Sequence, residues 1–201
     1  PDEGARPDEE LQFENEGVRQ IELDVFADPE GGRYADRHLN PLLGLPLASG
    51  VPELDEPGFK VFHVQEVDYE TTCVSFVACL GQIRGWSRAN PYHLPIAVLG
   101  ELKDDVIPDP VDAGFVQPIE IGPTELEALD AEIRSVFPDD ELITPDDVRG
   151  DAATLEAAIL ATGWPTLEES RGKVMFLMDN EGSERSDYLT GHPSLEGRPM
   201  F

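Results

Sequence analysis

Two short, almost uninterrupted runs of apolar residues constrain the fold of this chain more than any other feature of its sequence. They cover residues 94–102 (LPIAVLGEL) and 173–178 (KVMFLM). Strands with this composition are typical of parallel sheets, because helices cover such sheets and leave the strands buried on both faces. The residues between the two runs have helical periodicity, so we expect strands and helices to alternate along the chain.

Further strands fit this alternation. Residues 18–27 (VRQIELDVFA) alternate between apolar and polar side chains, and residues 59–65 (FKVFHVQ) predict a second strand. Leu142 and Ile143 indicate a short strand, and residues 198–201 indicate the beginning of one more.

Three segments predict helices. Apolar residues recur at helical spacing over 72–89, where Thr71 or Thr72 is the expected N-cap. A second helix is expected over 124–136, with a capping box from Thr124 to Glu127. A third helix is expected over 152–162, before Gly163 and Pro165.

This order of elements predicts an α/β fold, specifically a (β/α) barrel of the TIM type that forms one domain over residues 1–201. Complete barrels of this type run to about 250 residues, so we expect this barrel to be incomplete, with its first strand and its last strands missing. No glycine-rich turn follows a predicted strand, which excludes the dinucleotide-binding pattern.

The strong negative charge limits the classes of partner. The chain has 42 acidic and 14 basic residues, and its net charge is −28. Such a surface repels phosphate backbones, so we expect no nucleic-acid partner. No apolar run approaches the roughly 20 residues that a membrane helix needs, so we expect no transmembrane segment. The first residues do not have the basic-then-apolar pattern of a signal segment, so we expect position 1 to be the start of a processed or truncated product.

The two cysteines, Cys73 and Cys79, match no zinc motif. On one continuous helix their Cα atoms are about 9 Å apart, which is too far for a disulfide. A bridge therefore requires Cys73 to precede the helix, and two unbridged buried thiols are the alternative.

Ionisable residues lie near the carboxyl ends of three predicted strands. Glu22 and Asp24 are two residues apart and therefore face the same side of their strand. His63 lies near the end of the second strand, and Glu101 and Lys103 lie at the end of the third. Since the carboxyl ends of barrel strands form one rim, we expect these side chains to converge.

Three neighbouring carboxylates repel one another and stay ionised only around a cation. Oxygen ligands without cysteine suit Ca²⁺ or Mg²⁺. The alternatives are that Glu22 and Asp24 face solvent as ordinary strand residues and that His63 has a structural role.

Six segments of the chain resemble the bacterial calcium-dependent phosphoinositide-specific phospholipases C, and they keep the family's order. The segments are GVRQIELDVFADPEGGRYA, FKVFHVQEVDYETTCVSFVACL, PIAVLGELKDD, ITPDDVRG, GKVMFLMDNEG and YLTGHPSLEGR. The resemblance implies a distorted TIM barrel and a secreted, monomeric phosphoric diester hydrolase or lyase of lipid metabolism. Its expected reaction is the cleavage of phosphatidylinositol or phosphoinositides at a membrane surface to diacylglycerol and inositol phosphate, cyclic or linear.

The resemblance also implies roles for individual residues. Glu22, Asp24 and Glu101 match the calcium ligands, and His63 matches the histidine that stabilises the transition state and protonates the leaving group. Glu22 is the carboxylate ligand expected to act as a base. Two positions, Lys103 and Asp179, are expected to contact the inositol ring.

One part of the family's pattern is missing. The family has a first catalytic histidine and a metal-binding asparagine on its first barrel strand, and no such pair occurs in this chain. His38 and Asn40 do not match, because they follow Glu22 and Asp24 within a loop. Two alternatives therefore stay open: a related barrel phosphodiesterase acting on glycerophosphodiesters, and a non-catalytic fragment that binds calcium or a lipid head group.

Overall fold

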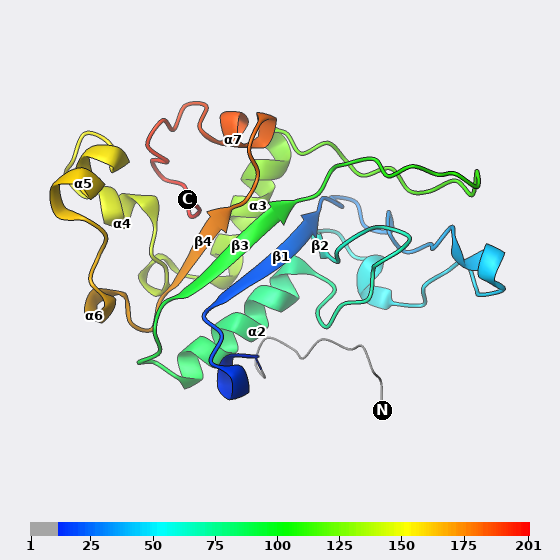
Figure 1. Ribbon diagram of the computed structural model, residues 1–201, viewed down its shortest axis with the longest axis horizontal. Helices are drawn as coiled ribbons and strands as arrows, with labels where there is room; N and C mark the ends of the chain where they lie inside the picture. The colour runs from blue at the N-terminus through cyan, green and yellow to red at the C-terminus, as the bar shows by residue number, and fades with distance from the viewer. Residues whose placement is uncertain (1–11) are drawn as a thin grey trace.

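The computed structural model describes residues 12–201 and is built around one sheet with the strand order β2-β1-β3-β4 (Figure 1). The strands β1 (Gln20–Phe26), β3 (Ile96–Leu102) and β4 (Val174–Met178) are parallel. The two apolar runs correspond to β3 and β4, which pair with each other, and the strand predicted over 18–27 is β1. The predicted α/β class is confirmed.

Two long helices, α2 (Phe76–Ala89) and α3 (Pro123–Val136), lie behind the sheet in the view of Figure 1. Alternation along β1 determines which side chains face them: Ile21, Leu23 and Val25 are buried, whereas Glu22 is exposed. The main core cluster joins the buried side chains of β1 to apolar residues of both helices, among them Leu80, Ile83, Leu126 and Ile133. The other face of β1 therefore carries its polar side chains.

Helix α2 begins at Phe76, four residues later than predicted. Ser75, not Thr71 or Thr72, caps it by accepting a hydrogen bond from the backbone N–H of Ala78 at 3.2 Å. Cys73 thus precedes the helix, and it forms a disulfide with Cys79 across a Cα–Cα distance of 5.3 Å. The bridge fastens the segment before α2 to the first turn of the helix.

The strand predicted over 59–65 is wrong in both length and direction. Strand β2 (Lys60–Val61) covers two residues and runs antiparallel to β1. The chain reverses soon after β2, where Val64 and Asp68 exchange backbone hydrogen bonds of 2.8 and 2.9 Å around Glu66, which has a φ of 67°. A residue with positive φ is typical of a tight turn, so the strand cannot continue as predicted.

Helix α3 confirms the second predicted helix but has a different cap. Pro123 occupies the first helical position, so the N-cap is Gly122 and the third helical residue is Glu125. The Glu125 carboxylate, rather than that of Glu127, accepts the backbone N–H of Gly122 at 3.2 Å.

The remaining helical elements are short, and the third predicted helix is the eight-residue α5. None of the described helices combines the length and the apolar character that crossing a bilayer requires. These elements are η1 (Gln12–Glu16), η2 (Asn40–Leu43), η3 (Pro52–Leu54), η4 (Asp139–Glu141), α4 (Pro145–Arg149), α5 (Leu155–Thr162), α6 (Leu167–Ser170) and α7 (Ser183–Tyr188).

The free edge of β4 carries two isolated bridges instead of the two short strands predicted there. Leu142 bridges to Val174 and Met200 bridges to Phe176, both in parallel orientation. Within residues 12–201 the sheet is therefore open, and these residues alone do not close a barrel.

A buried polar network fastens α3 to the segment that follows α7. Asp130 accepts hydrogen bonds from the Tyr188 hydroxyl (2.7 Å) and from the Arg198 guanidinium (2.9 Å), and all three residues are buried. Arg198 also donates to the exposed Glu127 at 2.7 Å. Burial raises the pKa of Asp130, whereas the bonds from Tyr188 and Arg198 oppose that rise.

The Asp130→Ala substitution should lower the free energy of unfolding by about 2–4 kcal/mol, because it leaves the Tyr188 hydroxyl and the buried Arg198 without their shared partner. The Glu127→Ala substitution should cost less than about 1 kcal/mol, because an exposed ion pair contributes little. Urea unfolding followed by tryptophan fluorescence measures both, and equal losses would contradict this assignment of the network.

Candidate metal centre

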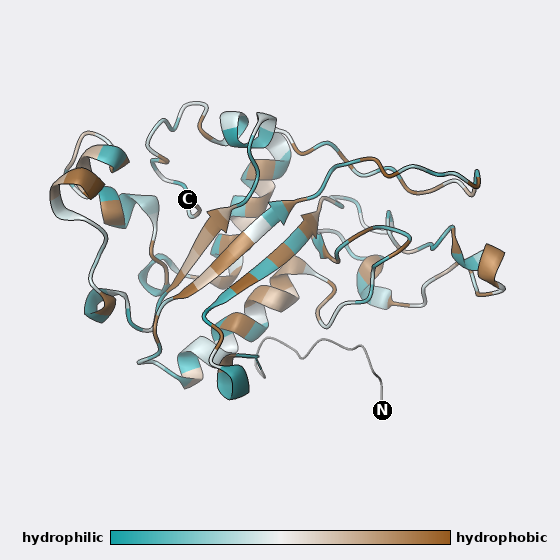
Figure 2. Cartoon of the chain, viewed as in Figure 1, coloured by the Kyte–Doolittle hydropathy of each residue, from teal (hydrophilic) through white to brown (hydrophobic). Residues whose placement is uncertain are grey.

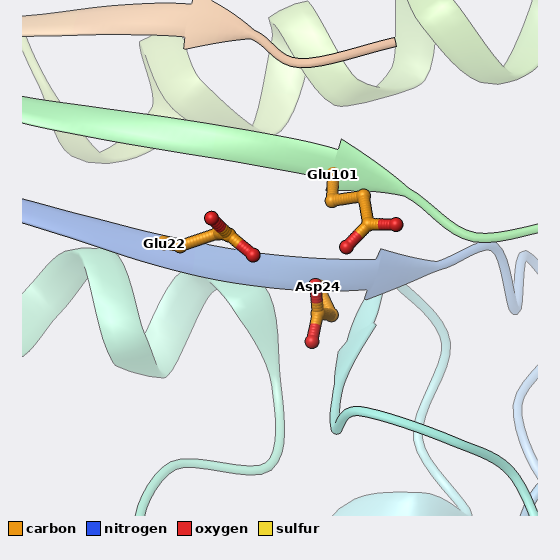
Figure 3. Close-up of side chains that lie close together, drawn as sticks. All are labelled: Glu22, Asp24 and Glu101. Atoms are coloured by element: carbon orange, nitrogen blue, oxygen red, sulfur yellow. The ribbon is translucent and has the colours of Figure 1, made fainter.

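Three carboxylates lie together on the face of the sheet opposite α2 and α3 (Figure 3). Glu22 and Asp24 come from β1, and Glu101 comes from β3, where it pairs in register with Asp24. One oxygen of each carboxylate lies within 4.8 Å of the corresponding oxygens of the other two. The pairing of two parallel strands thus brings together residues that are far apart in the sequence.

Asp24 is the carboxylate whose negative charge and hydrogen-bonding capacity the protein compensates least. Partial burial, followed by a hydrogen bond with the Glu101 carboxyl group, raises the pKa of Asp24 to about 7. Its Oδ1 atom is buried and has no hydrogen-bond partner among the described residues. A buried acceptor of this kind is costly unless a cation or a donor reaches it.

Glu101 holds its negative charge more easily than Asp24 does. The hydrogen bond with Asp24, together with a bond from Lys103, lowers the pKa of Glu101. The Lys103 ammonium donates to Glu101 Oε1 at 3.0 Å. In the pair formed by Asp24 and Glu101, the shared proton therefore belongs to Asp24.

These observations fit a hard divalent cation. Calcium binds oxygen ligands at about 2.3–2.6 Å, so two oxygens that share one ion lie within about 5 Å of each other. The three carboxylates meet that condition, and their donor set contains neither thiolate nor imidazole. A cation there also removes the need for a proton on Asp24.

His63 lies in the turn after β2 rather than on a strand. Its side chain is about half exposed, and its Nδ1 is 2.8 Å from Asp68 Oδ2. The charge of the protonated imidazole lowers the pKa of both Asp24 and Glu101, which places His63 within electrostatic reach of the carboxylates. Because Asp68 occupies Nδ1, Nε2 is the ring nitrogen available for proton transfer.

Asp179 follows β4 at the same end of the sheet, and its backbone N–H donates to Gly100 O at 3.0 Å. Its carboxylate is exposed and is not a member of the three-carboxylate cluster. The neighbouring Asn180 was not predicted, although its amide bonds both the N–H (2.7 Å) and the carbonyl (2.9 Å) of Leu102. Asn180 therefore braces the end of β3 next to Glu101, and only its place after a buried strand could have indicated it.

Residues 7–201 match the family model described as phosphoinositide phospholipase C, Ca²⁺-dependent. No curated protein matches the chain.

Among solved structures, a calcium-dependent phosphoinositol-specific phospholipase C from the Gram-negative bacterium Pseudomonas sp. in its apo form has a TM-score of 0.59 and 21% identity, over 92% of this chain and 55% of that one. A Ca²⁺-dependent phosphatidylinositol-specific phospholipase C from Streptomyces antibioticus has a TM-score of 0.57 and 21% identity. The match covers 92% of this chain and 56% of that enzyme's chain.

The structural similarity, at this level of identity, concerns the fold. The chain spans a little over half the length of these solved enzymes. The family match covers almost the whole chain and agrees with the resemblance carried by its sequence motifs. The chain belongs to the Ca²⁺-dependent phosphoinositide phospholipase C family.

Proposed function

We propose that the protein of which this chain is all or part cleaves phosphatidylinositol or phosphoinositides to diacylglycerol and inositol phosphate, with calcium as its cofactor. The observation that carries the proposal is the group formed by Glu22, Asp24 and Glu101, in which three carboxylate oxygens lie within 4.8 Å of one another and one buried oxygen of Asp24 has no partner within residues 12–201. The family match supports the same chemistry. We also propose that residues 1–201 form a single unit whose open sheet is part of a (β/α) barrel.

Glu22, Asp24 and Glu101 are the proposed calcium ligands. When bound, calcium supplies positive charge that stabilises the phosphate oxygens as negative charge builds up on them. Calcium also reduces the repulsion between a chain of net charge −28 and an anionic lipid head group.

The reaction begins with attack of the inositol 2-hydroxyl oxygen on the adjacent phosphorus. The nucleophile is part of the substrate, so its approach costs little entropy. Glu22 accepts the hydroxyl proton as the new O–P bond forms, and the bond from phosphorus to the glycerol oxygen breaks. His63, held at Nδ1 by Asp68, donates a proton to the departing glycerol oxygen.

Lys103 and Asp179 are the proposed contacts to the inositol ring. They lie just beyond the carboxyl ends of β3 and β4, and Lys103 bonds Glu101 of the carboxylate cluster. An ammonium group and a carboxylate can bind adjacent ring hydroxyls as donor and acceptor.

A non-catalytic role as a calcium or head-group binding module is the second candidate, and one observation favours it. The chain lacks the family's first histidine–asparagine pair, and His38 does not match it because it follows Glu22 and Asp24 within a loop. A third candidate, a phosphodiesterase acting on glycerophosphodiesters, predicts faster turnover of glycerophosphoinositol than of the intact lipid.

The Asp24→Asn and Glu101→Gln substitutions should each weaken calcium binding at least about tenfold, because each removes one negative ligand. Isothermal titration calorimetry measures the affinity. The matched control is Glu156→Gln, at an exposed position on α5, which should leave the affinity unchanged. Equal affinities in all three variants would exclude the proposed ligands.

Calcium affinity should also depend on pH near neutrality. The pKa of Asp24 is about 7 without a metal ion, and the ion binds only the deprotonated carboxylate. The affinity should therefore rise about tenfold between about pH 6 and about pH 8, and the number of protons released on binding should fall from about 0.9 to about 0.1 over the same range. Calorimetry in buffers of different ionisation enthalpy counts those protons, and a constant affinity over this range would contradict the prediction.

In the whole protein, His63→Ala should lower kcat on phosphatidylinositol by about 10²–10⁴-fold, as expected for the loss of a general acid. His192→Ala is the matched control, because His192 lies after α7 and bonds the backbone carbonyl of Glu196. Release of cyclic inositol phosphate with calcium and with a chelator is the measurement. Absence of that product under both conditions favours the non-catalytic candidate.

A further inference from the structure

A segment outside the carboxylate site exposes several large apolar side chains. Residues 40–47 (NPLLGLPL), here called the leucine segment, include Leu42, Leu43, Leu45 and Leu47, which are 60%, 67%, 52% and 42% exposed. The segment forms the outermost turn at the right of Figure 1, and Figure 2 shows the short helix there as strongly hydrophobic. Exposed apolar groups gathered on one projection indicate an interaction surface.

The exposure of these leucines is imposed by an ordered stem. Asp36 and Ala48 form an antiparallel bridge at its base, and the Arg37 N–H donates to Leu47 O at 2.7 Å. At the tip, the Asn40 side chain donates to Pro46 O at 3.1 Å, and the Leu45 N–H donates to Asn40 O at 3.0 Å. With these backbone groups paired inside the segment, entry into an apolar medium exposes few unsatisfied polar atoms.

Buried polar residues fix the leucine segment to the rest of the protein. Glu66, which is 3% exposed, accepts the backbone N–H of Leu39 at 3.3 Å and pairs with His38 at 3.2 Å. The guanidinium of the buried Arg37 lies over the ring of Tyr69, 3.7 Å from its centroid. The tip is therefore held in a defined direction.

The leucine segment projects from the end of the sheet where the carboxylates lie. The leucine segment belongs to the connection that follows β1, shortly after Asp24. The connection that follows β3 extends to the same side in Figure 1, and Arg33 ties the two together by donating to Gln117 O at 2.8 Å. The second connection exposes Val106 and Val111 but also carries several aspartates, so the leucine segment alone forms the apolar tip.

The local charge differs from that of the whole chain. No acidic residue occurs between Asp36 and Glu53, in a chain that has 42 of them. Arg37 is the one charged side chain in that interval apart from His38, and it is buried. The tip is thus apolar and uncharged, so it can approach a head-group layer that the rest of the surface repels.

The shape of the segment favours a bilayer over a protein partner. A stable protein interface buries about 800 Å² on each side, which is more than four partly exposed leucine side chains supply. Insertion of leucines into the boundary between head groups and acyl chains needs no such area, because its free energy grows with each apolar group buried.

We propose that the leucine segment inserts into the surface of a lipid bilayer and directs the carboxylate end of the sheet toward the head groups. This inference goes beyond the proposed catalytic function, because it requires neither calcium nor turnover.

The test places a reporter on the segment. Cys73 and Cys79 are joined, so Leu43→Cys introduces a single free thiol that can carry an environment-sensitive fluorophore. With vesicles of phosphatidylcholine and a chelator, its emission should shift to shorter wavelength. The same label at Leu160→Cys, an 80% exposed position on α5 at the opposite end of the molecule in Figure 1, should not respond.

Substitution provides a second measurement. Leu42→Ser with Leu43→Ser should weaken partitioning onto these vesicles at least about tenfold. Leu160→Ser with Leu167→Ser removes two other leucines that are more than 60% exposed and should leave partitioning unchanged. On vesicles with phosphatidylglycerol, binding of the unsubstituted protein should increase with salt, because salt screens the repulsion.

Three outcomes would overturn the proposal. The first is no emission shift at position 43, and the second is an equal shift at positions 43 and 160. The third is a lower sedimentation coefficient of the vesicle-free protein after Leu42→Ser with Leu43→Ser, which would assign the segment to a contact between copies of the chain.

Discussion

The mutual repulsion of three carboxylates on two adjacent parallel strands is the constraint on which the rest of this structure depends. Register between β1 and β3 sets Asp24 beside Glu101, and alternation along β1 puts Glu22 on the same face. Without a cation, the arrangement survives by keeping a proton on Asp24 and by pairing Glu101 with Lys103. Because the metal-free site needs both the proton and the ion pair to offset its negative charge, it is well suited to binding a cation.

The core and the carboxylate site lie on opposite faces of the sheet. Apolar side chains of β1 and β3 pack on α2 and α3, so the polar side chains of the same strands face away from the helices. Both strands have their carboxyl ends at the same end of the sheet, and the connections that follow them contain His63, Lys103 and the leucine segment. The proposed chemistry and the proposed membrane contact therefore lie at one end of a molecule that is strongly acidic as a whole.

Sequence patterns predicted the parts of the fold that follow from local periodicity. The strands β1, β3 and β4, the helices α2 and α3, and the convergence of Glu22, Asp24 and Glu101 all follow from alternation and from parallel pairing. The reversal after β2 and the cap at Ser75 were not predicted, and the disulfide was left open, because these features depend on Glu66 at positive φ and on where α2 begins. The environment of His63 depends on the same reversal, which brings Asp68 to its ring.

A crystal structure of the protein grown with calcium tests the central claim most directly. The account predicts one ion on the carboxylate face of the sheet, with oxygens of Glu22, Asp24 and Glu101 at about 2.3–2.6 Å from it and Asp24 Oδ1 no longer unpaired. An ion bound elsewhere at saturating calcium, with the Asp24 and Glu101 carboxyl groups still within hydrogen-bond distance of each other, would contradict it.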